Sequence, residues 1–254
     1  LFGNTVRAGD NAAIIFQDPL KCLNPTVKIG RQIAETVRNR KKCTWREAKK
    51  RSEELLDSVG IRHPRLRMKQ YPFELSGGMR QRVVIAIALA CEPNLIVADE
   101  PTTALDAAMQ VRVIRLLKKI VKETNTALLL VSHNMGVIAA ACDYVYVMKD
   151  GKMIENGCAD DIFYNPSHPY TKGLLRSMPR VDAESYERLI PIEGTPVDML
   201  NPPEGCPFAP RCEQCMKICL KKMPPYVEIS ENHRSACWLR VQERLNKEEK
   251  NNES

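Results

Sequence analysis

Two acidic residues, Asp99 and Glu100, directly follow the apolar run 95–98. A short apolar run that ends in acids is typical of a buried parallel strand, and open α/β sheets bind ligands at that C-terminal edge. An aspartate there suits Mg²⁺, and the glutamate beside it suits a base that orients an attacking water. If these acids stood alone, a helix N-cap pair in a loop would be the simpler interpretation.

Two further stretches argue against that simpler interpretation. Ser132 and His133 follow the apolar run 127–131, so a second buried strand is predicted to present polar groups at the same sheet edge. From that edge the His133 ring is predicted to reach a γ-phosphate. Upstream, Ser76 is a good N-cap and Gly77 and Gly78 leave backbone N–H groups open at a helix start, which is a typical anion site.

The elements that position these residues can be predicted from periodicity. Residues 83–90 are apolar on every side and predict a buried helix. The other predicted elements are a strand at 12–16, a helix with Ile33 and Val37 on one side, a helix at 47–59 ended by Gly60, a helix at 107–122 with Val111, Ile114, Leu117 and Val121 on one side, a hairpin of 144–148 with 153–154 through Asp150 and Gly151, and a short helix ending at Met178.

Taken together, these stretches resemble the motifs of ATP-binding cassette (ABC) ATPases. The matching motifs are the signature at 75–82, the Walker B strand at 95–101, the D-loop at Leu105-Asp106, the switch histidine His133 and the Q-loop residue Gln17. The resemblance runs from about residue 11 to residue 238. It implies the α/β, P-loop NTPase-type ABC nucleotide-binding domain over residues 1–179, with an inserted helical subdomain at about 22–90 that meets a membrane-spanning partner.

The same resemblance implies a role for each site residue. Ser76, Gly77 and Gly78, with Gln81, would bind the ATP held by a partner subunit. Asp99 would hold Mg²⁺ through water, and Glu100 would polarise the attacking water. Gln17 and His133 would sense the metal and the γ-phosphate, and Asp106 would communicate across the dimer.

The phosphate-cradling loop G-x-x-x-x-G-K-[ST], the Walker A motif, is absent from the printed sequence. In the family it lies upstream of the Q-loop, and only sixteen residues precede Gln17. We expect an N-terminally truncated record of a normal subunit. The alternative is a degenerate partner that contributes only its signature motif.

Ten cysteines in an apparently cytosolic protein argue against disulfides and for a metal or redox role. Five of them lie in the Pro-rich stretch 205–237, which lacks the apolar residues for a core and needs a staple. Zinc or an iron–sulfur cluster would serve. Only Cys212 and Cys215 have the C-x₂-C spacing of a zinc knuckle, and uneven spacing is more usual for a cluster.

This stretch resembles the C-terminal extension of the oligopeptide/dipeptide branch of ABC ATPases, through residues 168–171, Glu193-Gly194, Gly205-Cys206, 210–212, Cys219, His233 and Cys237. The resemblance implies a [4Fe–4S] cluster on Cys206, Cys212, Cys219 and Cys237. Cys215 departs from the pattern as a spare thiol or an alternative ligand. We expect an extension at 180–240 and a charged tail at 241–254 that is a frayed helix or disordered.

Composition limits the remaining classes. Hydrophobic residues make up 44% of the 254 residues, enough for a substantial core, and no apolar run approaches the ~20 residues of a membrane span. We therefore expect neither a membrane span nor a signal peptide. The net charge is +7, with a basic cluster at 38–51. Because Trp45 is its only aromatic residue, a solvated helix face is favoured over a nucleic-acid site.

The predicted function is ATP binding and hydrolysis that powers dipeptide or oligopeptide import from the cytoplasmic face of the membrane. The implied cofactors are ATP, Mg²⁺ and a [4Fe–4S] cluster. The implied partners are a second ABC ATPase subunit, two permease subunits and, indirectly, an extracytoplasmic peptide-binding protein, with no nucleic acid. The alternatives are a nickel or glutathione importer ATPase, or a non-transport ABC protein that acts on nucleic acid or ribosomes.

Overall fold

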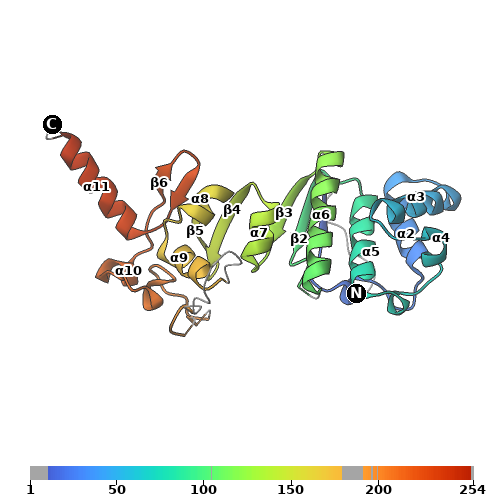
Figure 1. Cartoon of the computed structure of the whole chain (residues 1–254), viewed down its shortest axis with the longest axis horizontal. Coiled ribbons are helices and arrows are strands. Elements are labelled where there is room, and N and C mark those ends of the chain that lie inside the picture. Colours follow the sequence, from blue (N-terminus) through green and yellow to red (C-terminus); the bar gives the residue numbers. More distant parts are fainter. Residues whose placement is uncertain (1–10, 104, 179–190, 196, 199, 253–254) are drawn as a thin grey trace, which may run out of the picture. The chain divides into compact units, whose positions relative to one another are not determined.

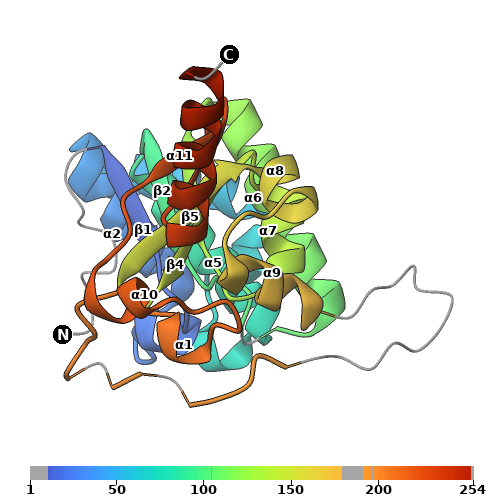
Figure 2. The ribbon, with the colours of Figure 1, turned by 90° about the vertical axis from the view of Figure 1, so that its left-hand side faces the viewer.

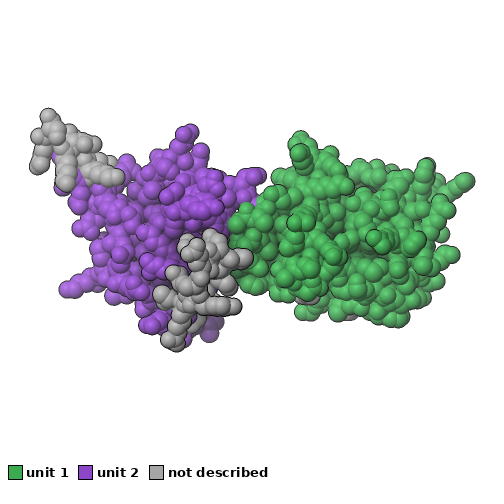
Figure 3. All heavy atoms as spheres, viewed as in Figure 1, with its two compact units in different colours: residues 1–141 green, residues 142–254 purple. Residues whose placement is uncertain are grey.

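The structure is a computed structural model that describes residues 11–103, 105–178, 191–195, 197–198 and 200–252. The chain forms two compact units, residues 1–141 and residues 142–254 (Figure 1, Figure 3). This division reflects strand pairing, since late strands of the chain complete a sheet that begins at residue 144. The expected boundary between the ATPase domain and the C-terminal extension, near residue 179, lies outside the described residues and stays a prediction.

Unit 1 contains a parallel sheet of β1 (Ala12–Ile15), β2 (Leu95–Asp99) and β3 (Ala127–Val131), in the order β1-β2-β3. The three predicted strands are confirmed. Ile15 pairs with Ala98 and Asp99 pairs with Val131, so all three strands end at one edge. The prediction that β3 is buried was wrong: Leu129 and Val131 are 49% and 48% exposed. Successive side chains of a strand point to opposite faces of the sheet, and only the face of Leu128 and Leu130 packs against the core of unit 1.

Helices make up the rest of unit 1. They are α1 (Pro19–Cys22), α2 (Ile29–Lys41), α3 (Trp45–Ser58), α4 (Pro64–Arg67), the 3₁₀ turn η1 (Pro72–Glu74), α5 (Gly77–Ala90), α6 (Ala107–Thr124) and α7 (Met135–Ala141). A capping box of Thr44 and Glu47 starts α3. The apolar stripe of α6 differs from our prediction: Val111 is exposed, and the buried residues are Val113, Ile114, Leu117 and Ile120.

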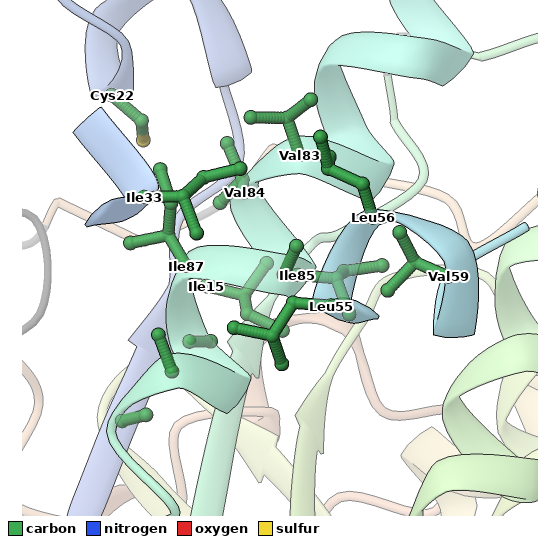
Figure 4. Close-up of a cluster of buried hydrophobic side chains, with 14 of the residues drawn as sticks. Ile15, Cys22, Ile33, Leu55, Leu56, Val59, Val83, Val84, Ile85 and Ile87 are labelled. Carbon is green, nitrogen blue, oxygen red and sulfur yellow. The ribbon is translucent and has the colours of Figure 1, made fainter. Parts of the chain in front are cut away.

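One hydrophobic core joins the helices of unit 1 to the sheet. Ile15 of β1, Ile33 of α2, Leu55 of α3 and Ile85 of α5 belong to the same buried cluster (Figure 4). Residues 83–88 of α5 are all buried, which confirms the prediction of a helix apolar on every side. The helices between residues 22 and 90 therefore share one hydrophobic core with β1 and β2, the strands that precede Gln17 and Glu100.

Unit 2 is built on an antiparallel sheet in the order β4-β5-β7-β6. The strands are β4 (Tyr144–Lys149), β5 (Lys152–Cys158), β6 (Val227–Ser230) and β7 (His233–Ser235). Asp150 and Gly151 both have positive φ, 46° and 74°, which confirms the predicted hairpin turn. The helices are α8 (Ala159–Tyr164), α9 (Pro169–Arg176), η2 (Ala209–Arg211), α10 (Lys217–Lys221) and α11 (Trp238–Asn252).

The predicted charged tail is helical as far as it is described, because α11 runs to Asn252 (Figure 1, Figure 2). The start of the predicted extension, residues 180–190, lies outside the described residues. Among the described helices, none combines the length and the apolar character that a membrane crossing requires.

A fully buried glutamate ties unit 2 together. Glu155 of β5 accepts hydrogen bonds from the backbone N–H groups of Ser167 and His168, and its Oε1 lies 2.9 Å from His233 Nε2 of β7. Three segments that are distant in sequence therefore meet at one carboxylate. Buried polar groups are stable only when they are paired in this way.

Candidate functional site

The side chain of Glu100 lies at the C-terminal edge of the parallel sheet, where residues from three chain segments converge on it. Its Oε2 accepts hydrogen bonds from Gln17 Nε2 at 3.1 Å and from Thr103 Oγ1 at 2.7 Å, and its Oε1 lies 2.7 Å from His133 Nδ1. Gln17 follows β1, Glu100 follows β2 and His133 follows β3. Parallel pairing is what brings these three strand ends together.

Local backbone geometry positions each of these side chains. Glu100 has a positive φ of 44°, which is rare for a residue with a side chain, and its N–H donates to Val131 O of β3 at 2.9 Å. His133 sits in a turn where Asn134 N donates to Ser132 Oγ and Asn134 Oδ1 accepts from Val137 N at the start of α7. The His133 side chain remains 69% exposed.

The hydrogen bonds set the charge state of Glu100. The His133 hydrogen bond and, next, the Thr103 hydrogen bond lower the pKa of Glu100 below its usual value. The carboxylate is therefore ionised at neutral pH. Each carboxylate oxygen has two lone pairs, so Oε1, which one described partner contacts, can also accept from a water.

Thr103 is a site residue that our sequence reasoning missed. It lies in the turn after Pro101, where its N–H donates to Glu100 O at 3.3 Å and its hydroxyl reaches the carboxylate. A signal was present in the sequence. Pro101 at the second position of a four-residue turn favours a β-turn, and a β-turn brings its fourth residue, Thr103, close to its first, Glu100.

Asp99 is exposed at the last position of β2. Carboxylate oxygens are ligands that Mg²⁺ prefers, and Mg²⁺ in phosphate sites uses one or two protein carboxylates and keeps several waters. Gln17 donates its Nε2–H to Glu100, so its amide oxygen is oriented away from that carboxylate. The donor types present therefore fit Mg²⁺.

The signature residues form the start of α5. Ser76 is the N-cap, and its Oγ accepts from Met79 N at 3.4 Å. A Cβ on Gly78 would lie 2.1 Å from Met109 Cε, so this helix start packs against the first turn of α6. Asp106 caps α6 by accepting from Met109 N at 2.9 Å. In the described part of the chain, no hydrogen bond joins this group to Glu100.

Gln81, a predicted cofactor-binding residue, is buried in unit 1. Its side chain is 1% exposed, and its Nε2 is buried without a hydrogen-bond partner among the described residues. Position 81 lies three residues after the buried Gly78 and three before the buried Val84, on the face of α5 that packs into the core. Its role toward a nucleotide stays a prediction.

Four of the cysteines between residues 205 and 237 form a second group. Cys206, Cys212, Cys219 and Cys237 line one pocket together with His168, Phe208 and Trp238. Of the five cysteines in this described segment, Cys215 alone is exposed. Within the described residues, no set of three His, Cys, Asp or Glu side chains is arranged for a single metal ion. The same residues contain no disulfide.

Burial governs the protonation of these thiols. The pKa of Cys206 is raised to about 11, mainly by burial and to a smaller extent by the neighbouring cysteines. Burial also raises the pKa values of Cys212 and Cys237. These three thiols are therefore protonated at neutral pH without a cation, and a bound metal group would have to displace their protons.

Comparison with known proteins identifies the family. The chain is 48% identical over 234 residues to the dipeptide transport ATP-binding protein DppD of Bacillus subtilis, covering 92% of this chain and 70% of that protein. It is 46% identical over 242 residues to the oligopeptide transport ATP-binding protein OppD of Salmonella typhimurium, covering 95% and 71%. The chain belongs to the ABC transporter ATP-binding proteins. It spans about two thirds of the length of these relatives.

Family matches cover both units. Residues 4–103 match the ABC transporter family, and residues 154–219 match the oligopeptide/dipeptide transporter C-terminal region. The second match begins inside β5 and lies entirely within unit 2.

Solved ABC structures share the fold. One is cbiO1 from Clostridium perfringens, part of an ABC transporter complex, with a TM-score of 0.55, 29% identity, and coverage of 61% of this chain and 60% of that chain. Another is a dimeric ATP-binding cassette in a post-hydrolysis state bound to ADP and phosphate, with a TM-score of 0.52, 29% identity, and coverage of 59% and 63%. The predicted fold class is confirmed.

In this ABC ATP-binding protein, the basic cluster at 38–51 is partly neutralised by contacts within unit 1. Lys41 and Arg51 lie 2.6 Å and 3.8 Å from Glu92, and Arg38 stacks over Trp45 at 4.9 Å. A cation that is already paired contributes less to binding an external polyanion. The cluster therefore gives little support to the nucleic-acid alternative.

Proposed function

We propose that this chain provides the ATP-hydrolysing machinery of an importer of dipeptides or oligopeptides, and that it acts at the cytoplasmic face of the membrane. The convergence of Gln17, Thr103 and His133 on Glu100 is the observation that carries the hydrolytic part of the proposal. The peptide part rests on the relatives that transport dipeptides or oligopeptides.

Glu100 would orient the attacking water, since it is ionised and Oε1 has accepting capacity left. His133 donates through Nδ1 to Glu100, which leaves Nε2 on the exposed side of the ring. Nε2 would face the γ-phosphate of a bound nucleotide. Asp99 and the Gln17 amide oxygen would hold Mg²⁺, which when bound neutralises phosphate charge.

The signature residues Ser76, Gly77 and Gly78 would act on the nucleotide held by a second ATPase subunit. Their helix start offers backbone N–H groups and the positive end of the α5 dipole. The dimeric state of a solved relative supports this arrangement. Asp106, which starts α6 beside this group, would carry the coupling between the two subunits. Two permease subunits and a peptide-binding protein would complete the transporter.

The test of this function is transport by the assembled protein. In proteoliposomes that contain the ATPase and permease subunits, we expect ATP-driven uptake of a radiolabelled dipeptide or oligopeptide presented by the binding protein. Glutathione and a nickel chelate in the same assay test the alternative importers. Retention on DNA at physiological salt, with no association with permease subunits, would contradict the proposal in favour of a nucleic-acid function.

We also propose that Cys206, Cys212, Cys219 and Cys237 hold a [4Fe–4S] cluster. Four cysteine thiolates are the donor set of such a cluster, and these four line one pocket. Thiolates on a cluster of several irons lie further apart than the ligands of one ion, which is compatible with the lack of a single-ion site among the described residues. The cluster would supply the cross-link that the small core around Phe208 lacks.

Metal and sulfide analysis tests the cluster. Protein purified without oxygen is expected to contain iron and acid-labile sulfide in equal amounts, and Cys219→Ser is expected to lose both. Cys215→Ser is the matched control and is expected to keep both, because Cys215 is exposed. Stoichiometric zinc without sulfide would contradict the cluster, and loss of iron in Cys215→Ser would contradict the choice of ligands.

A further inference from the structure

His168 lines the cysteine pocket and carries a buried polar atom that lacks a partner among the described residues. Its residue is 1% exposed and lines the pocket with all four proposed cluster cysteines. Its ring also lies 6.2 Å, between centroids, from the Phe208 ring on the same lining. Its Nε2 atom is buried and has no hydrogen-bond partner among the described residues. A buried polar atom without a partner is costly and calls for an explanation.

The other ring nitrogen defines the tautomer. Nδ1 accepts a hydrogen bond from Tyr170 N at 3.0 Å, which makes His168 the N-cap of α9. A nitrogen that accepts carries no proton, so the proton of the neutral ring is on Nε2. Nε2 is therefore a donor, and it points away from the helix start.

The backbone of His168 is also held in place. Its N–H donates to Glu155 Oε2 of β5 at 3.0 Å. The backbone of His168 is thus tied to the sheet, and its ring is tied to α9 through Nδ1. The ring orientation is thus fixed by contacts that do not involve the pocket. The ring that carries this donor is therefore held in place beside the pocket.

We propose that His168 Nε2–H donates a hydrogen bond to a sulfur of the cluster held by the four cysteines, and that it raises the reduction potential of that cluster. The inference rests on the cluster proposed above. Sulfur carries more negative charge in the reduced cluster, so a hydrogen bond to it stabilises the reduced state more. His168 is a positioning and tuning residue by this argument.

Two substitutions separate this role from helix capping. Asn places an oxygen near the position of Nδ1 and can cap α9, but it lacks the distal donor. Gln places an amide N–H near the position of Nε2, but it loses the cap. His168→Asn therefore keeps the helix cap and loses the distal donor, whereas His168→Gln keeps the distal donor and loses the helix cap.

The experiment is redox titration of the anaerobically purified protein, followed by absorption and electron paramagnetic resonance. His168→Asn is expected to lower the reduction equilibrium constant roughly tenfold, about 59 mV for a one-electron couple, with iron content unchanged. His168→Gln is expected to keep a potential near that of the wild type but to lower the thermal unfolding midpoint. Fe–S stretching frequencies in resonance Raman spectra should rise in His168→Asn, because a hydrogen bond to sulfur weakens the Fe–S bond.

The outcomes are distinguishable. A fully loaded His168→Asn protein with the wild-type potential would overturn this inference and leave the cluster proposal intact. Equal potential shifts in the Asn and Gln variants would also overturn it, since they would trace the effect to packing. A wild-type protein without iron and sulfide would overturn the cluster proposal, and this inference with it.

Discussion

Replacing Glu100 by Gln is expected to cut ATP turnover by the assembled transporter ~10²–10⁴-fold while nucleotide binding persists. The amide has nearly the shape of the carboxylate but cannot take a proton from water. The local fold should tolerate it, because the Gln17 amide can rotate and His133 can change tautomer to match the new donor. Steady-state hydrolysis and equilibrium nucleotide binding measure the two quantities separately.

Thr103→Val provides the matched control for Glu100. It removes one donor to the same carboxylate and keeps the side-chain shape. The Thr103 hydrogen bond lowers the pKa of Glu100, so its loss raises that pKa, and the acidic limb of the turnover profile should move to higher pH. Turnover at high pH should stay close to the wild-type value.

Wild-type turnover in Glu100→Gln would show that another group orients the water.

Replacing Glu155 by Leu is expected to destabilise unit 2 by about 3–5 kcal/mol. The substitution leaves the backbone N–H groups of Ser167 and His168 and the His233 ring buried without their acceptor. Glu155→Gln retains one acceptor oxygen and should cost less. Glu228→Leu, at an exposed position of β6 in the same sheet, should change stability by only about 0.5 kcal/mol.

Fluorescence can report unit 2 by itself. The chain has two tryptophans, Trp45 in unit 1 and Trp238 in unit 2. In a Trp45→Phe background, denaturant unfolding followed at Trp238 monitors unit 2. If Glu155→Leu and Glu228→Leu shifted the transition equally, Glu155 would have no special role in holding the sheet to the 167–168 segment.

The sequence alone determined the elements around the nucleotide site. The strands before Glu100 and His133, the apolar segment 83–90 of α5 and the Asp150-Gly151 turn follow from patterns a few residues long, and each is present. Because β2 and β3 pair in parallel, Glu100 and His133, which follow them, lie at the same edge of the sheet. Such features are predictable because period, capping and turn chemistry act between near neighbours in the chain.

Tertiary structure decided what depends on distant segments. The pairing of β7 with β5 places residues from both ends of unit 2 in one sheet, and the core of unit 1 buries Gln81 and leaves Val111 exposed. His233 contacts Glu155, 78 positions away in sequence. The same carboxylate accepts the backbone N–H of His168, which lines the cysteine pocket. No local pattern encodes these contacts, because each results from how whole elements pack and pair.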